Sequence, residues 1–161
     1  MCTGTAPRFE KLMEEVVAFS MDHVHQGGIP FTALVVDPNG LVLGRGVNRV
    51  RENHDPTAHA EVEAIRDACR THGISTLSGA TLLASGEPCA MCYICARSAG
   101  VAKVFFAADR NEAAEYGFDY RSTYRAFSGD PLSWSIPTAK RLPVSNQLGP
   151  FRAFHSQPGA Y

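Results

Sequence analysis

Apolar residues recur with a helical period near the start of the chain and then gather in short runs typical of strands. Over 9–25 they fall close to every third or fourth position, which predicts an amphipathic helix that ends at Gly27-Gly28. Two short apolar runs follow, 31–36 and 41–48, and the turn sequence 37–40 between them predicts a β-hairpin.

The middle of the chain alternates helical and strand patterns. Arg49 to Thr57 is polar and is expected to be a loop. The elements expected after it are, in order, a helix at 58–71 with Thr57 as its N-cap, a strand at 80–84, a helix from Pro88 to about Ala99, a strand at 101–107 and a helix at 110–116. This alternation favours an α/β fold in which an antiparallel hairpin is followed by parallel strands.

The last part of the chain, 127–161, has a different pattern because prolines recur through it. Its aromatic side chains include Trp134, Phe151, Phe154 and Tyr161. A segment so often interrupted is not expected to build its own core, yet it is too apolar to be a flexible linker. We therefore expect a single domain over 1–161, with a core at 1–126 and an irregular tail that packs on that core or on a second copy.

Composition narrows the possible partners and the setting. The formal net charge of -1 gives no electrostatic reason to bind a polyanion, so nucleic acid is not the expected partner. No apolar run is long enough to span a membrane, and the first residues lack the apolar core of a signal peptide. The five cysteines are an odd number with three bunched together, which argues against a disulfide framework and indicates a reducing cytoplasm.

His59, Cys89 and Cys92 form a set of zinc ligands. The two cysteines stand three apart at the start of a predicted helix and so share one face, and His59 stands at the start of another helix. If the strands before these helices are adjacent and parallel, both helix N-termini point to the same edge of the sheet. Three ligands leave one tetrahedral position open, so we expect one Zn²⁺ per chain with a water or hydroxide as fourth ligand.

Glu61 stands two residues after His59 and is not needed to hold a metal. It can act as the proton carrier of a catalytic site, because it points away from the helix face that carries the ligand. The signature histidine-x-glutamate followed by proline-cysteine-x-x-cysteine is typical of zinc deaminases that act on nucleobases. A structural zinc in a non-catalytic module is the alternative, and Glu61 and the missing fourth ligand both oppose it.

These motifs resemble those of the cytidine deaminase superfamily. Its two signatures match 55–61 and 87–92, while 28–31 and 44–48 resemble its first two strand motifs. The resemblance implies a five-stranded mixed sheet flanked by helices, and hydrolytic removal of an amine from a small nucleobase-like substrate. The substrate contacts that it implies are Phe31, Asn48, Ala60, Glu87, Asp119 and Tyr161.

Within the superfamily, the bacterial guanine deaminases look nearest. Segments 109–119 and 149–161 resemble their alanine-rich helix and their C-terminal segment, which implies conversion of guanine to xanthine. In that group the tail crosses to the partner of a homodimer and a terminal tyrosine covers the active site. This chain departs from the group at Tyr120, where they have a second aspartate implicated in proton transfer. A tRNA adenosine deaminase, or a deaminase of cytosine, an aminopurine, a pterin or an aminotriazine, is the alternative.

Overall fold

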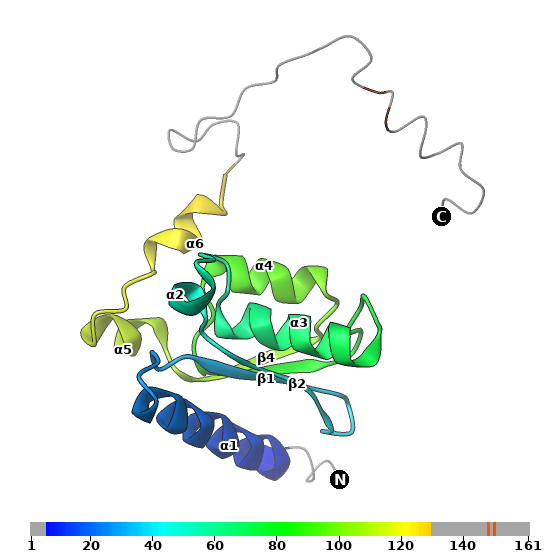
Figure 1. The fold of residues 1–161 in the computed structure, drawn as a ribbon, viewed down its shortest axis with the longest axis horizontal. Helices are drawn as coiled ribbons and strands as arrows, with labels where there is room; N and C mark the ends of the chain where they lie inside the picture. The colour runs from blue at the N-terminus through cyan, green and yellow to red at the C-terminus, as the bar shows by residue number, and fades with distance from the viewer. Residues whose placement is uncertain (1–5, 130–147, 149, 151–161) are drawn as a thin grey trace, which may run out of the picture. The chain divides into compact units, whose positions relative to one another are not determined.

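The structure is a computed structural model that describes residues 6–129, 148 and 150. The chain divides into two units, Met1–Phe127 and Ser128–Tyr161, and the first contains a sheet with helices packed on it (Figure 1). The helices are α1 (Ala6–His25), α2 (Val50–Asn53), α3 (Ala60–His72), α4 (Ala90–Ser98), α5 (Arg110–Glu115) and α6 (Ser122–Ala126). The strands are β1 (Thr32–Val36), β2 (Val42–Val47), β3 (Thr81–Gly86) and β4 (Lys103–Ala108).

The strand order of the sheet is β2-β1-β3-β4. β1 pairs antiparallel with β2, as the predicted hairpin requires, and also antiparallel with β3 on its other side. β3 and β4 are parallel, as expected. The expectation of a five-stranded sheet is wrong for the described residues, which form four strands, because the described chain after β4 continues into α5 and α6.

The central position of β1 determines which loops meet at one edge of the sheet. β2 and β3 run in the same direction but are not neighbours, which corrects the expectation that the strands before the two motif helices are adjacent. Thr32 lies opposite Val47, and Ala33 lies opposite Ala84. The start of β1 is therefore at the edge where β2 and β3 end, and the helices that follow those two strands begin at that edge.

Alternation along β1 divides the core into two layers. Leu34 and Val36 pack with Val16 of α1 on one face, and Ala33 and Val35 pack with α3 on the other. Figure 1 shows this arrangement, with α1 on one side of the sheet and α3 and α4 on the opposite side. Every residue of β1 is buried, as a central strand covered on both faces requires. In the described part of the chain, no helix is both long and apolar enough to cross a membrane.

Two glycines of β2 allow α3 to lie at backbone distance from the sheet. A Cβ atom at Gly46 would lie 2.0 Å from the carbonyl oxygen of Ala60 and 2.4 Å from the amide nitrogen of Ala64. A Cβ atom at Gly44 would lie 2.4 Å from the amide nitrogen of Ala68. Because these are backbone atoms, no side-chain rotation could relieve the overlap. Small residues on both elements thus set the position of the whole of α3.

The starts of α3 and α4 differ from the predictions, and two short helices were not predicted. The N-cap of α3 is His59 and not Thr57, whose amide and hydroxyl instead donate to Asp55. The N-cap of α4 is Cys89, so Pro88 precedes the helix and does not open it. The 4-residue α2 and 5-residue α6 were not predicted, since helices of about one turn leave no periodic apolar pattern.

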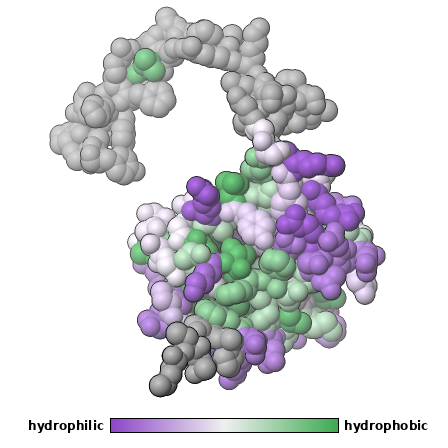
Figure 2. Space-filling model, turned by 180° about the vertical axis from the view of Figure 1, so that it is seen from behind, coloured by the Kyte–Doolittle hydropathy of each residue, from purple (hydrophilic) through white to green (hydrophobic). Residues whose placement is uncertain are grey.

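β4 is an edge strand of the described sheet and keeps apolar side chains at the surface. Phe105 and Phe106 are 41% and 37% exposed, and Phe105 contacts Phe9 of α1 with ring centroids 5.2 Å apart. α1 itself exposes Val17 and Met21. Figure 2 shows apolar surface on the first unit, seen from the side opposite to that of Figure 1. An apolar edge of this kind favours contact with another segment or chain.

Candidate active site

The three predicted metal ligands meet at the edge where β2 and β3 end. His59 is the N-cap of α3, Cys89 is the N-cap of α4, and Cys92 lies in the first turn of α4. His59 Nδ1 is 3.6 Å from each of the two sulfur atoms, and the sulfur atoms are 3.6 Å from one another. The three donor atoms therefore form a nearly equilateral triangle.

This triangle has the dimensions of a zinc site. Zn–S bonds of about 2.3 Å and a Zn–N bond of about 2.0–2.1 Å at tetrahedral angles require donor atoms roughly 3.5–3.8 Å apart. No other His, Cys, Asp or Glu of the described residues belongs to the group, and Cys95, three residues after Cys92, is outside it. A tetrahedral ion held here would keep one position free, which is typical of catalytic and not of structural zinc.

Hydrogen bonds within the triangle favour a thiolate at Cys89. The hydrogen bond between the Cys89 and Cys92 sulfur atoms lowers the pKa of Cys89 to about 4, and the hydrogen bond to His59 contributes in the same direction. That bond and burial raise the pKa of Cys92, while the bond to Cys89 raises the pKa of His59. The N-terminus of α4 also favours negative charge on Cys89. A charged sulfur at this position suits a divalent cation.

Glu61 lies beside the triangle and is almost completely buried. It is in the first turn of α3, and only 4% of its surface is exposed. Its Oε2 accepts a hydrogen bond from Cys92 Sγ at 3.4 Å. Burial raises the pKa of the Glu61 carboxyl above its usual value. A carboxyl with a raised pKa, next to an open metal position, can take up a proton and release it again.

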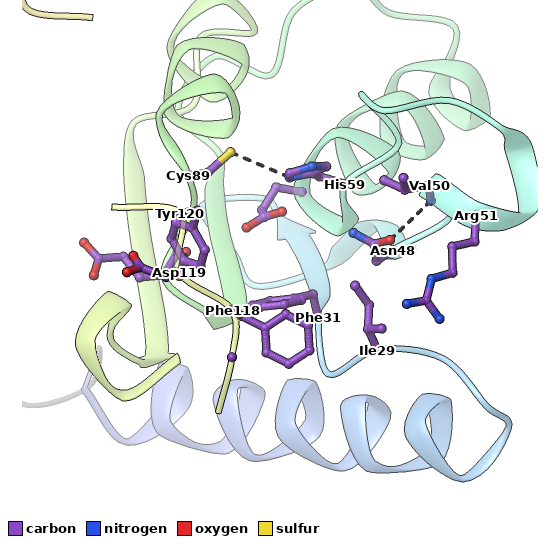
Figure 3. Close-up of a pocket in the computed structure, with 13 residues that line it drawn as sticks. Ile29, Phe31, Asn48, Val50, Arg51, His59, Cys89, Phe118, Asp119 and Tyr120 are labelled. Atoms are coloured by element: carbon purple, nitrogen blue, oxygen red, sulfur yellow. Dashed lines mark hydrogen bonds between the residues drawn. The ribbon is translucent and has the colours of Figure 1, made fainter. Parts of the chain in front are cut away.

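A cavity of about 380 Å³ opens beside His59, Glu61 and Cys89 (Figure 3). Four of the substrate contacts implied by the resemblance line it, namely Phe31, Asn48, Glu87 and Asp119. Ala60 is not among the lining residues, because it is buried in the core against β2. Tyr161 lies outside the described residues, as do Trp134, Phe151 and Phe154.

Phe31 and Asn48 give the cavity an aromatic wall and a polar wall. The Phe31 ring meets the Phe118 ring edge to face, with centroids 5.1 Å apart at 90°. Asn48 Oδ1 accepts a hydrogen bond from the Val50 amide at 3.2 Å. Figure 3 shows that this bond turns the Asn48 amide nitrogen toward the cavity. Asn48 thus serves as a turn residue after β2 and also presents a donor to the cavity.

The carboxylates of Glu87 and Asp119 are held by arginines. Glu87 Oε2 accepts the Arg110 amide at 2.9 Å and its other oxygen pairs with the Arg110 guanidinium, which lowers the pKa of Glu87. The Asp119 carboxylate accepts from Arg121 at 2.7 Å, and this bond lowers the pKa of Asp119 to about 2. Both groups are charged and already paired within the wall of the cavity.

Comparison with known proteins agrees with this geometry. The family model for the cytidine and deoxycytidylate deaminase zinc-binding region matches residues 7–108, which include His59, Glu61, Cys89 and Cys92. The chain belongs to this deaminase family. Guanine deaminase from Bacillus subtilis (strain 168) is 36% identical over 148 residues, which cover 91% of this chain and 94% of that protein. The solved structure of guanine deaminase from Bacillus subtilis matches with a TM-score of 0.83 at 34% identity, over 93% of this chain and 95% of that one.

Two further relatives differ in the share of this deaminase that they match. The solved structure of guanine deaminase from Nitrosomonas europaea is 26% identical with a TM-score of 0.64, and the match covers 88% of this chain and 70% of that one. The tRNA-specific adenosine deaminase from Agrobacterium fabrum is 37% identical over 113 residues, 69% of this chain and 70% of that protein. The predicted α/β fold of the cytidine deaminase type and the predicted zinc dependence are confirmed.

Two tyrosine hydroxyl groups at the deaminase site make contacts that the sequence did not reveal. Tyr120 donates to the carbonyl oxygen of Glu87 at 2.6 Å, and Tyr124 donates to that of Pro88. Burial raises the pKa of both phenols, so both stay protonated as donors. These bonds hold the two residues that precede Cys89. Since each tyrosine is more than thirty residues from its partner, with separations of 33 and 36, no local spacing could signal the contact.

Two arginines of the deaminase site were likewise missed. Arg110 pairs with Glu87, and its guanidinium lies over the Tyr124 ring, 3.7 Å from the centroid. Arg51 lines the cavity from α2, inside the segment that was predicted to be a polar loop. A single charge in a polar stretch gives no signal on its own, and only the fold of this segment brings Arg51 to the cavity.

Proposed function

We propose that this chain catalyses the hydrolytic deamination of guanine to xanthine and ammonia. The observation that carries the proposal is the buried Glu61 carboxyl beside the triangle of donor atoms, open to a cavity, in a chain similar to guanine deaminase along nearly its whole length. Because 91% of the chain is aligned with the Bacillus subtilis protein, that similarity must continue beyond residue 126 into the tail.

The residues of the site divide the chemistry between them. His59, Cys89 and Cys92 would hold Zn²⁺, which would supply Lewis-acid activation of a water molecule. Glu61 would take a proton from that water and deliver it to the ring nitrogen beside the amine-bearing carbon as the water oxygen bonds to that carbon. It would then carry the proton of the new hydroxyl to the amino group, which leaves as ammonia while the carbon–oxygen double bond forms. Since only 4% of Glu61 is exposed, this carboxyl is shielded from bulk solvent, which suits a proton carrier.

The walls of the cavity orient the base. Phe31, supported by Phe118, offers an aromatic face against which a planar heterocycle can pack. The Asn48 amide nitrogen, turned toward the cavity by its bond to Val50, can donate to an acceptor of the ring. Glu87 and Asp119 shape the opposite wall in this proposal, where Glu87 pairs with Arg110 and Asp119 pairs with Arg121.

The test is ammonia release from a panel of guanine, cytosine, adenine, their nucleosides, pterins and aminotriazines, with wild type and Glu61→Gln. We expect guanine to be the preferred substrate, and Glu61→Gln to keep its zinc while losing turnover by roughly 10²–10⁴-fold. Glu63→Gln is the matched control, because Glu63 lies on the same helix and pairs with Arg66. A Glu61→Gln variant that turns over at a near-normal rate would contradict the assigned role.

A second candidate, a tRNA adenosine deaminase, is favoured by the similarity to tRNA-specific enzymes. The net charge of -1 and the smaller share of the chain that those relatives match both oppose it. Formation of inosine in tRNA by the purified chain, without xanthine from guanine, would establish this second function.

The proposal extends to a homodimer in which 127–161 of one chain reaches the site of its partner, in a cytoplasmic setting where thiols stay reduced. The apolar edge at Phe105 and Phe106 supports contact with a further segment or chain. Light scattering gives the oligomeric state. Mixing the Glu61→Gln variant with a chain that ends at Leu148 tests whether the tail of one chain completes the site of its partner. Activity that is restored on mixing supports this. Two inactive proteins that stay inactive when mixed contradict it.

A further inference from the structure

Arg51 differs from the other charged residues around the cavity because no group of the described residues engages its guanidinium. Glu87 is paired with Arg110, and Asp119 is paired with Arg121. Among the described residues, the Arg51 guanidinium takes part in no hydrogen bond and no ion pair, although Arg51 lines the cavity. A cation at a cavity wall with its donors unused is available to a ligand.

Arg51 lies at the end of the cavity away from the sulfur atoms. It stands on α2, three residues after Asn48. Figure 3 shows Arg51 on the same side of the cavity as Asn48 and Ile29, while Cys89 and Tyr120 lie on the other side. A base whose amine-bearing carbon sits at the donor triangle therefore turns another of its edges toward Asn48 and Arg51.

The chemistry of guanine matches this arrangement. Its amine is on C2, and its O6 and N7 atoms lie together on an edge away from C2. Both atoms are acceptors, and the planar guanidinium fork of arginine is the group that binds this pair most often and in a bidentate manner. A base without the C6 oxygen offers the fork only one acceptor.

We infer that Arg51 is a specificity-determining residue that donates two N–H groups to the O6 and N7 edge of a 6-oxopurine. This inference rests on the proposed deamination of guanine and names the edge of the base that the chain reads. In this role Arg51 does no proton transfer. It holds the base so that C2 stays at the donor triangle, and it favours 6-oxopurines over bases that lack the acceptor at C6.

The experiment compares guanine with 2-aminopurine, which carries the same amine on C2 but only hydrogen on C6. The proteins are wild type, Arg51→Met, Arg51→Lys and the control Arg97→Met, which removes an exposed arginine on α4 outside the cavity lining. For Arg51→Met we expect kcat/KM for guanine to fall roughly 5- to 150-fold, with a clearly smaller change for 2-aminopurine. Arg51→Lys should resemble Arg51→Met, because an ammonium cannot form the fork.

The outcomes separate this inference from the proposed function. Wild type that releases no ammonia from guanine refutes the proposed function itself. If wild type is active, two results overturn the assignment of Arg51. One is an equal loss of kcat/KM for guanine and for 2-aminopurine in Arg51→Met. The other is an Arg51→Lys variant that prefers guanine to 2-aminopurine as strongly as wild type does. A loss of preference in Arg97→Met would also overturn it, because a general effect of charge would then explain the result. Selective loss on guanine in both Arg51 variants, with Arg97→Met unchanged, supports it.

Discussion

Replacing Gly46 with alanine tests whether the contact between β2 and α3 positions the catalytic machinery. The added Cβ would lie 2.0 Å from the carbonyl oxygen of Ala60 and 2.4 Å from the amide nitrogen of Ala64. Both are backbone atoms, so α3 must move away from β2 by about 1 Å or more to reach an ordinary contact distance. His59 and Glu61 stand at the start of this helix and would move with it.

Two magnitudes follow from that displacement. Overpacking of a close contact costs about 1–3 kcal/mol, and the upper half of this range is expected because backbone must shift. For a chain of this length such a loss lowers the Tm by roughly 4–12 °C. A misplacement of about 1 Å at a reacting centre can cost about 10²-fold in rate. We therefore expect kcat/KM to fall far more than the loss of folded protein alone could explain.

The assay combines thermal unfolding, zinc content and steady-state rates at a temperature where both proteins are folded. Gly73→Ala is the matched control, because it adds one methyl group at the other end of α3, where nothing lies within 4 Å. Because Gly73 has a φ of +62°, alanine at this position should lower the free energy of unfolding by about 1–2 kcal/mol without displacing α3. If Gly46→Ala matches Gly73→Ala in rate as well as in stability, α3 is not positioned by this contact and the reasoning fails.

Two further substitutions test the wall that holds Cys89. Tyr120→Phe removes the hydroxyl that donates to Glu87 and should cost about 0.5–1.5 kcal/mol in the free energy of unfolding, with a rate loss below about tenfold; a loss of 10²-fold or more, about 2.7 kcal/mol, would show that the phenol takes part in chemistry. The pKa of Glu87 is below its usual value because Arg110 binds its carboxylate. The charged Glu87 therefore stabilises the folded protein at any pH above the usual pKa of a glutamate, and this stabilisation is lost as the pH falls through the lowered pKa. Glu87→Gln should therefore be less stable near neutral pH and lose less stability on acidification, and parallel Tm-against-pH curves for the two proteins would contradict this.

The sequence by itself determined the reaction chemistry and the order of most helices and strands. His59, Cys89 and Cys92 could be recognised because metal ligands are defined by residue type and short spacing. Glu61 could be predicted as the proton carrier because it stands two residues after His59 in the sequence. The periodic patterns that predicted the longer elements are also local, and they are lost where an element has only about one turn, as in α2 and α6.

Tertiary structure alone decided which distant residues surround that chemistry. β1 lies between β2 and β3, and this antiparallel insertion brings Phe31 and Asn48 to the edge where both motif helices begin. The bond from Tyr120 to Glu87 and the presence of Arg51 in the cavity wall arise in the same way. These contacts join residues far apart in sequence, and their free energy depends on packing of the whole fold. A local sequence pattern does not encode such a contact, which is why the reaction could be predicted from the sequence and the position of Arg51 in the cavity wall could not.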